Sequence, residues 1–312
     1  MGIRDEDYVY VIVQRSINGT PRRYLERMAS RQVEDYRTEG LFLDSFLTYS
    51  GINESADTMT FSSSGGWGFA DTITVTASAP TFTAADVGKG VTMWVPASPP
   101  IAIARITIVT YVSGTVVSGL PSTVFPEDEV PVVPELLRAT PTAFWSIAVG
   151  KVGGLAHLAS SDVGILANGV ALTGIVVEEG ADWVVDLGGN LYDVVHVGLP
   201  IEADFETLDL DAGGPSNVRD KAKLVRAASL LVDKSRGIMV GPDGAHLAEV
   251  PPEAGAVLET DIFDTTSGLV RSEIVEAPID ATWGRPGRVF VRQSEPYPLA
   301  ILGVIPEGKI GG

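Results

Sequence analysis

Alternating apolar and polar positions dominate the sequence and predict strands rather than helices. Runs such as YVYVIVQRSI, DTITVTAS and ARITIVTYVSG are rich in β-branched and aromatic residues, and turns that contain glycine or proline separate them. Few long windows lack such a breaker, so long helices are expected to be rare. The pattern predicts an all-β chain, in which an antiparallel β-sandwich or barrel domain is interrupted by a second, small β-barrel domain.

The clearest local pattern is a β-hairpin near the N-terminus, centred on Asn18-Gly19. Asn-Gly supplies the two positive φ values that a type I′ turn needs, so the turn also sets the register of the strands. The predicted pairs are Ile17 with Thr20, Ser16 with Pro21, Val13 with Tyr24 and Ile12 with Leu25. Pro21 belongs to a non-hydrogen-bonded pair, so its missing N–H points outward, which marks the second strand as a sheet edge.

Composition divides the chain into an inserted module and a discontinuous flanking domain. In residues 52–152 charges become rare, and serine, threonine, alanine and valine predominate in short strands. Their spacing of about ten residues predicts a small barrel or sandwich. Residues 1–51 and 153–312 are expected to form the flanking β domain. Within it, residues 218–236 fit both helical and strand spacing, and periodicity alone does not decide between them.

Charge and cysteine content exclude several classes of function. The formal charge is −18, so specific nucleic-acid binding and binding to an anionic membrane are disfavoured. The same charge suits a wall past which nucleic acid slides without sticking. The absence of cysteine excludes disulfides, thiolate metal sites and cysteine nucleophiles. No signal segment or run of about 18 apolar residues is present, so we expect a soluble protein, made in a cytosol, without a membrane anchor.

Three carboxylates follow one another on one face of a predicted strand. Glu202, Asp204 and Glu206 alternate with less polar residues, which places neighbouring carboxylates about 7 Å apart. A glycosidase pair needs two carboxylates that flank a bond in a cleft, one of them with a raised pKa. Such pairs usually come from different strands. A solvated face is therefore the favoured interpretation, and a catalytic or metal-binding row is the alternative.

No other group of residues has the spacing of a catalytic or metal site. His157, His196 and His246 lie far apart, and the first two are expected to be structural histidines with hydrogen-bonded rings. Residues 209–214 resemble part of a calcium loop but lack its later ligands. The five tryptophans are expected to be core anchors. They are Trp67, Trp94, Trp145, Trp183 and Trp283. We therefore predict no catalytic residue, no cofactor site and no metal site.

Ordered motifs along the chain resemble one protein family. The first block contains R-x-I-N-G, R-Y-[IL]-E and [FL]-x-D-S-x-x-T-Y-x-G. Its matching residues are Arg15, Ile17, Asn18, Gly19, Arg23, Tyr24, Glu26, Asp44, Ser45, Thr48, Tyr49 and Gly51. Later blocks are matched by GLAHLASSDVGILANGV, VVHVGLPIEADFETLDLD and RPGRVFVRQSEPYPLAILGVIPE. Over residues 1–51 and 152–312 the chain resembles the C-terminal part of tail nozzle proteins of short-tailed phages (podoviruses), also called tail tubular protein B or phage stabilisation proteins.

The resemblance implies a structural virion protein rather than an enzyme. Relatives form six-fold rings at the distal end of the tail, continue the tube, gate the DNA exit and contact other tail proteins. It implies a hexameric ring in the phage tail, made in the host cytoplasm, with the tail adaptor and tail fibres or spikes as partners. DNA would only pass through the channel. The resemblance also favours a strand for residues 218–236.

Two further features follow from comparison with this family. Residues 52–152 resemble the small barrel-like module called FCCH-like, inserted where some relatives have only a few residues. Relatives usually carry a large N-terminal β-rich region that this chain lacks, which implies either a fragment or a nozzle divided between polypeptides. Ile201 stands where the family often has an aromatic residue.

Two other functions stay open beside the nozzle. The first is a tail adhesin, whose inserted barrel binds host glycan or another tail protein. Its candidate aromatic residues, for each of which a core role is favoured, are Trp67, Phe69, Trp94 and Tyr111. The second is a polysaccharide depolymerase that uses Glu202 and Glu206.

In a nozzle, the carboxylate row is instead expected to line a channel or an outer wall, where it reduces DNA adhesion. Ring contacts are expected at the edge near Pro21 or at the inserted module.

Overall fold

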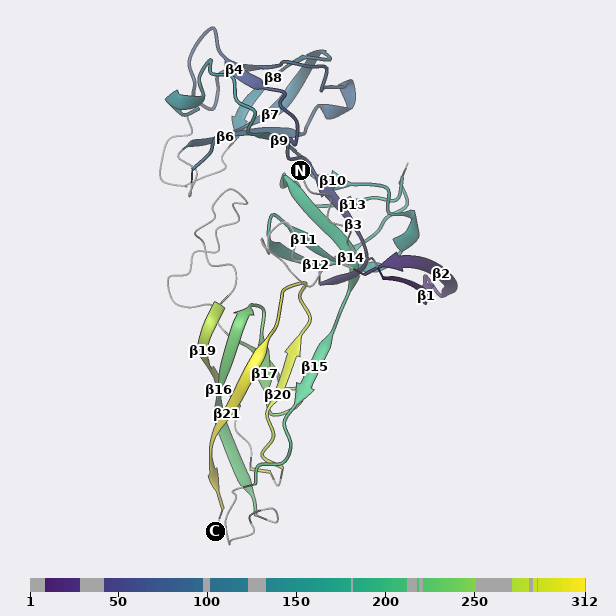
Figure 1. Ribbon diagram of the computed structural model, residues 1–312, viewed down its shortest axis with the longest axis vertical. Coiled ribbons are helices and arrows are strands. Elements are labelled where there is room, and N and C mark those ends of the chain that lie inside the picture. Colours follow the sequence, from purple (N-terminus) through teal and green to yellow (C-terminus); the bar gives the residue numbers. More distant parts are fainter. Residues whose placement is uncertain are drawn as a thin grey trace.

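The chain folds almost entirely into strands in the computed structural model, which describes residues 9–28, 42–97, 102–122, 133–180, 182–211, 218, 221–250, 271–280, 283–284 and 286–311. These residues form twenty-one strands and three short 3₁₀-helices, and none of them is in an α-helix. The predicted all-β class is confirmed. Figure 1 shows an elongated molecule of three successive bodies, with a hairpin that projects from the middle one.

The N-terminal hairpin consists of β1 (Tyr10–Ile17) and β2 (Thr20–Arg27). The observed register is the predicted one along its whole length. Asn18 and Gly19 have φ values of 47° and 69°, as a type I′ turn requires. Neither strand pairs with any other strand of the described chain, so both outer edges of the hairpin are open.

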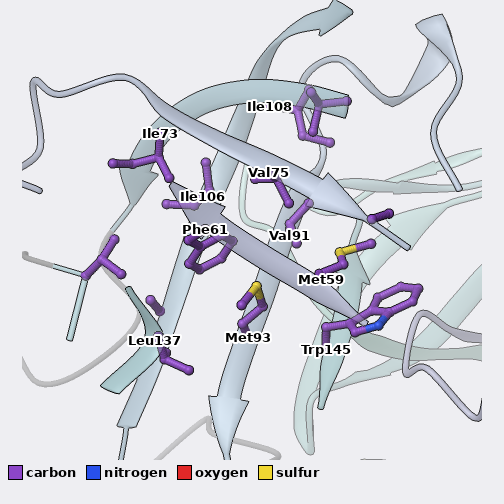
Figure 2. Close-up of a cluster of buried hydrophobic side chains, with 14 of the residues drawn as sticks. Met59, Phe61, Ile73, Val75, Val91, Met93, Ile106, Ile108, Leu137 and Trp145 are labelled. Atoms are coloured by element: carbon purple, nitrogen blue, oxygen red, sulfur yellow. The ribbon is translucent and has the colours of Figure 1, made fainter. Parts of the chain in front are cut away.

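A six-stranded antiparallel sheet at the top of Figure 1 lies wholly within residues 52–152. In spatial order its strands are β4 (Met59–Ser62), β5 (Ile73–Ala77), β8 (Val116–Ser122), β7 (Ala102–Ser113), β6 (Gly90–Val95) and β9 (Trp145–Ala148). Two 3₁₀-helices connect them, η1 (Ala84–Asp86) and η2 (Glu135–Leu137). A bridge between Met59 and Thr142 brings the two ends of the sheet together around a core, drawn in Figure 2, in which Phe61 and Met93 are fully buried.

The middle body joins segments that lie on either side of the insertion. Its four-stranded sheet has the order β12 (Val170–Val176), β11 (Asp162–Ala167), β14 (Val194–Pro200) and β3 (Leu43–Ser50). The same core contains residues of a small sheet and a 3₁₀-helix, namely β10 (Lys151–Val152), β13 (Val185–Asp186) and η3 (Ala156–Leu158). Because β3 precedes the insertion and β14 follows it, their antiparallel pairing brings the two flanking segments together.

The C-terminal body is a sandwich of two sheets around one shared core. The first sheet has the order β15 (Ala203–Glu206), β20 (Phe290–Gln293), β17 (Met239–Gly241) and β18 (Ala248–Glu249). The second has the order β19 (Arg271–Pro278), β16 (Lys223–Ser235) and β21 (Ile301–Ile310). Leu230 of β16 and Val291 of β20 are both buried in the core between them.

The stretch with ambiguous periodicity is strand β16, as the family pattern predicted. Its pairing with β21 shifts register between Val225 and Ala227, and its pairing with β19 shifts between Val232 and Ser235. Each β-bulge adds a residue to one strand and interrupts the alternation of inward and outward side chains. The apolar positions therefore follow neither a strict strand period nor a helical one.

Four of the five tryptophans pack in cores. Trp94 and Trp145 are buried, while Trp67 and Trp183 are partly buried against the cores of the insertion and the middle body. Trp283 is 56% exposed, so its predicted role as a core anchor is wrong. The next residue joins a sheet only through one isolated bridge, so the indole lies at a sheet margin rather than between two layers.

Gly51 is expected to tolerate no side chain. A Cβ there would lie 1.9 Å from the carbonyl oxygen of Ile147 in β9, whereas a Cβ at Gly65 would meet no atom within 4 Å. We expect Gly51→Ala to lower the free energy of unfolding by about 3 kcal/mol, measured by chemical denaturation, because backbone must move to relieve the overlap. Gly65→Ala is the matched control and should stay near wild type. Equal stability of the two variants would contradict this close approach.

Candidate functional site

Residues of the quoted motifs meet beneath the hairpin in one cluster, which we call the clamp. Its members are Arg15, Tyr24 and Glu26 of the hairpin, Asp44 and Ser45 of β3, and His157 of η3. The hairpin register places its three members on the same face, because side chains two residues apart along a strand share a face and directly paired residues do too. The first motif block and the block GLAHLASSDVGILANGV, which contains His157, therefore both contribute side chains to the clamp.

A forked ion pair forms the centre of the clamp. Arg15 donates from Nε and Nη2 to the two carboxylate oxygens of Glu26, each at 2.8 Å, and its Nη1 lies 3.1 Å from Asp44 Oδ2. Ser45 Oγ donates to Glu26 Oε1 at 2.6 Å. The hydrogen bond from Arg15 lowers the pKa of Glu26, partial burial opposes it, and Ser45 acts in the same direction as Arg15. Glu26 is therefore held as a carboxylate.

His157 of η3 completes the clamp by contacting both the hairpin and β3. Tyr24 Oη donates to the carbonyl oxygen of His157 at 2.7 Å. His157 Nε2 lies 2.9 Å from the carbonyl oxygen of Ser45, and because a carbonyl only accepts, the ring nitrogen donates. Ser45 has a φ of 48°, a left-handed conformation that is strained for a residue with a side chain. His157 is thus a hydrogen-bonded structural residue, as predicted.

The hairpin face opposite the clamp is apolar and exposed. Ile12, Leu25 and Tyr10 are 77%, 72% and 58% exposed. Ile12 and Leu25 are direct cross-strand partners, so their side chains form one continuous surface. The clamp therefore fixes the orientation of this exposed apolar surface.

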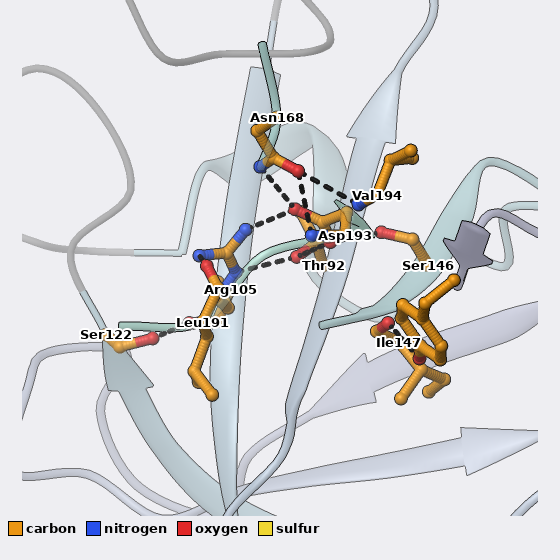
Figure 3. Close-up of polar contacts among 10 residues, drawn as sticks. Thr92, Arg105, Ser122, Ser146, Ile147, Asn168, Leu191, Asp193 and Val194 are labelled. Atoms are coloured by element: carbon orange, nitrogen blue, oxygen red, sulfur yellow. Dashed lines mark hydrogen bonds and ion pairs between the residues drawn. The ribbon is translucent and has the colours of Figure 1, made fainter. Parts of the chain in front are cut away.

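A second polar cluster, the buried junction, joins the insertion to the middle body (Figure 3). Its centre is Asp193, which has no solvent exposure. The surrounding members are Thr92, Arg105 and Ser146 of the insertion and Asn168 of the turn between β11 and β12. All four are buried too.

The acceptor positions of the Asp193 carboxylate are filled. Its Oδ1 accepts hydrogen bonds from Thr92 Oγ1 at 2.9 Å and Ser146 Oγ at 2.6 Å. Its Oδ2 accepts from Arg105 Nη2 and, at 3.2 Å, from Asn168 Nδ2. Arg105 Nε also donates to Thr92 Oγ1 at 2.8 Å. A carboxylate has about four lone-pair sites, so none is left for a substrate or a metal ion, and the junction is structural.

Sequence reasoning missed the buried junction although a signal was present. Arg105 and Asp193 are single charged residues inside the apolar runs ARITIV and YDVVHV, and opposite charges in such positions indicate a buried pair. Asn168-Gly169 repeats the Asn-Gly turn of the hairpin, with φ values of 47° and 80°. Asn168 Oδ1 accepts the backbone N–H groups of Asp193 and Val194, each at 2.9 Å.

The carboxylate row on β15 is solvent-accessible and paired with arginines. Arg292 pairs with Glu202 and Asp204, and Arg288 pairs with Glu206 and Asp209. Arg292 lowers the pKa of Asp204, whereas a general acid needs a raised pKa. Phe205, on the other face of this edge strand, is 46% exposed, so neither face of β15 is part of a core. The geometry agrees with a solvated face.

The other candidate residues do not come together. His196 is buried in β14, with Nδ1 2.8 Å from Thr48 Oγ1, and His246 is exposed beside Asp243. Within the described residues, no three histidine, aspartate or glutamate side chains are arranged to hold a metal ion. The last three positions of the calcium-loop-like stretch, residues 212–214, lie outside the described residues.

Loss of the Asp193 carboxylate is expected to be strongly destabilising. Asp193→Ala would leave the Arg105 guanidinium buried without its counter-charge, which costs about 3–5 kcal/mol. We expect that loss in the free energy of unfolding, measured by urea denaturation. Asp186→Ala, which removes an exposed partner of Lys151, is the control and should change stability little. A similar small effect for both variants would show that the junction does not hold the two bodies together.

Acid is expected to weaken the clamp. Since the folded-state pKa of Glu26 lies below its ordinary value of 4.5, the folded protein binds fewer protons than the unfolded chain. The stabilisation is therefore present above about pH 4.5 and is lost as the pH falls through the lowered pKa. We expect the stability difference between wild type and Glu26→Gln to be constant near neutrality and to shrink in acid, in urea titrations at a series of pH values. Glu54→Gln, outside the clamp, is the control, and a pH-independent difference for Glu26→Gln would refute the prediction.

Comparison with known proteins adds no relative. No protein-family model matches the sequence, and no curated protein sequence matches it. Among the residues that the structure describes, no helix is long and apolar enough to cross a membrane.

Proposed function

We propose that the chain is a non-catalytic structural subunit of a short phage tail, of the tail-nozzle type that its motifs resemble. In this role it associates with copies of itself in a ring, hexameric in the resembled family, through which DNA passes. The tail adaptor and the tail fibres or spikes are its other proposed partners. The observation that carries the proposal is the clamp, where motif residues from separate parts of the sequence converge.

The chemistry of the clamp favours presentation of a surface over catalysis. Arg15, Glu26 and Ser45 satisfy one another, so no nucleophile or proton donor among them is directed at a free space. The clamp holds the two-stranded hairpin against the middle body. A hairpin of this kind is only marginally stable in isolation. The hairpin in turn exposes Ile12 and Leu25, which contribute to no core of the described chain. An element of that kind is useful in an assembly.

The charge of the chain supports the part of the proposal that concerns DNA. A formal charge of −18 leaves few partners for phosphate, so a wall of this protein would let DNA slide. On and beside β15 four carboxylates pair with two arginines, so this group of side chains stays net negative after pairing. Glu202, Asp204 and Glu206 therefore remain candidates for a surface that lines a channel.

A tail adhesin is the second candidate, and two exposed aromatic residues of the insertion favour it. Phe69 and Tyr111 are 42% and 37% exposed, which corrects the core role that was expected for them. Trp94 is buried, and Trp67 is partly buried against the core, so they do not extend this surface. Glycan binding by the full chain that is lost in Phe69→Ala or Tyr111→Ala would support an adhesin.

The proposal predicts where the chain is found in a virus particle. In virions produced from the genome that encodes it, gold-labelled antibodies against the chain should mark the distal end of the tail. Cryo-electron microscopy of those tails should show identical copies around the DNA channel. Absence of the chain from purified particles, or a location on the capsid shell alone, would overturn the proposal. Burial of the β15 carboxylates at a subunit contact would overturn only their assignment to the channel wall.

A further inference from the structure

We propose that the exposed face of the hairpin of one copy docks on the outer face of the sheet β19-β16-β21 of a second copy, in a head-to-tail contact. This inference rests on the proposed assembly function and names the two surfaces that meet in it. We call them the hairpin face and the sheet face. Each is defined by strand register and by exposure in the single chain.

The hairpin face is apolar and basic. Its cross-strand pairs are Tyr10 with Arg27, Ile12 with Leu25, Gln14 with Arg23 and Ser16 with Pro21. It contains two arginines and no carboxylate, because Glu26 points to the clamp side. Residues 9–28 as a whole hold four arginines against one glutamate, a net charge of +3 in a chain of net charge −18. The hairpin is therefore a basic element on an acidic protein.

The sheet face is apolar and acidic. Leu231 and Ile274 are direct cross-strand partners and are 39% and 64% exposed, and Ile305 on β21 is 62% exposed. Glu276 is exposed in the same row as Ile305, because both pair with the same residue of β16. Asp233 is exposed two residues beyond Leu231, on the same face of β16. The exposed Arg226 pairs with Glu307 and interacts with Glu276, and the carboxylates of Glu276, Glu307 and Asp233 outnumber it. Apolar side chains with an excess of acidic neighbours are the counterpart of the hairpin face.

The neighbours of these residues confirm that the sheet face is an outer face. Leu230 and Val232 of β16 and Val275 of β19 point the other way and are buried in the sandwich core. The exposed residues alternate with them, as the pleat of a strand requires. Among the described residues, the sheet face is therefore the outer side of a filled core and not the remnant of an unfilled one.

The position of the two faces suits a contact that repeats. In Figure 1 the hairpin projects on the right of the middle body, and the sheet β19-β16-β21 forms the left-hand layer of the C-terminal body. A subunit that carries complementary patches at separate places can use both at once. Such heterologous contacts generate a closed ring when the rotation between neighbours closes. Charge complementarity favours a second copy as the occupant, because every copy brings the basic patch and the acidic patch in equal number.

Disulfide trapping can test the contact directly, because the chain has no cysteine of its own. Ile12→Cys and Ile274→Cys each change a highly exposed side chain, so both variants should fold as wild type. The two full-length variants, distinguished by a size tag, are mixed and oxidised mildly. We expect the mixed dimer to exceed either symmetric dimer by about tenfold, equivalent to about 1.4 kcal/mol of preference. Cross-linking requires Cα atoms within about 7 Å, so it reports adjacency.

Charge reversal provides a second, independent measurement in the same system. Arg23→Glu in the Ile12→Cys chain, or Glu276→Arg in the Ile274→Cys chain, should slow formation of the mixed dimer. The two reversals together should restore its rate, because opposite charges then meet again. Phe69→Cys, an exposed position on the insertion, replaces Ile274→Cys as the control and should show no preference for the hairpin.

The outcomes separate this inference from the proposed function. A statistical mixture of the three dimers, or equal cross-linking to Phe69→Cys, would overturn the contact. A dominant symmetric Ile12→Cys dimer would replace it with a contact of two hairpins. If the contact fails while labelled copies still surround the channel in virions, the nozzle proposal stands with another interface. If the contact is trapped but the chain is absent from virions, the self-association stands and the nozzle proposal falls.

Discussion

The buried carboxylate of Asp193 is the constraint on which the arrangement of the insertion and the middle body depends. Removing a carboxylate and a guanidinium from water costs several kcal/mol for each ion, which is offset only where every donor and acceptor is matched. Here the donors come from three strands of the insertion and from one turn of the middle body. A rotation of the insertion would break several of these bonds together. The junction therefore restricts the orientation of the insertion relative to the middle body, because few orientations satisfy the hydrogen bonds of the buried charges.

The clamp applies the same principle to an element with a different purpose. Arg15 and Glu26 are less buried than the residues of the junction, yet they connect the hairpin to β3 through Asp44 and Ser45. The bonds hold a hairpin that adds no residue to the three main cores of the described chain. Its apolar outer face is a cost to the isolated subunit, because exposed apolar surface favours association. The arrangement agrees with the proposed role of the chain as one subunit of an assembly.

Local chemistry could be predicted from the sequence, and long-range pairing could not. Asn18-Gly19 determined a turn type and thereby the register of the hairpin, because the geometry of a two-residue turn leaves no choice. In β16 two bulges interrupt the alternation, so only the family pattern indicated a strand. The pair of Arg105 and Asp193 spans 88 residues, and nothing local specifies which charges meet. For Trp283 the sequence predicted burial that the structure does not show, since a large apolar side chain need not lie between two layers.

The distribution of charge separates two requirements that would conflict on one surface. A protein that surrounds DNA must not bind phosphate, whereas subunits of an assembly must bind one another. In the proposed nozzle the acidic excess serves the first requirement, and the carboxylates on and beside β15 keep a net negative charge even with Arg288 and Arg292 beside them. The second requirement needs a patch of opposite charge, which Arg23 and Arg27 supply on the hairpin face. An arginine-rich surface left open beside DNA would attract it, so the positive charge is useful only where a neighbouring subunit covers it.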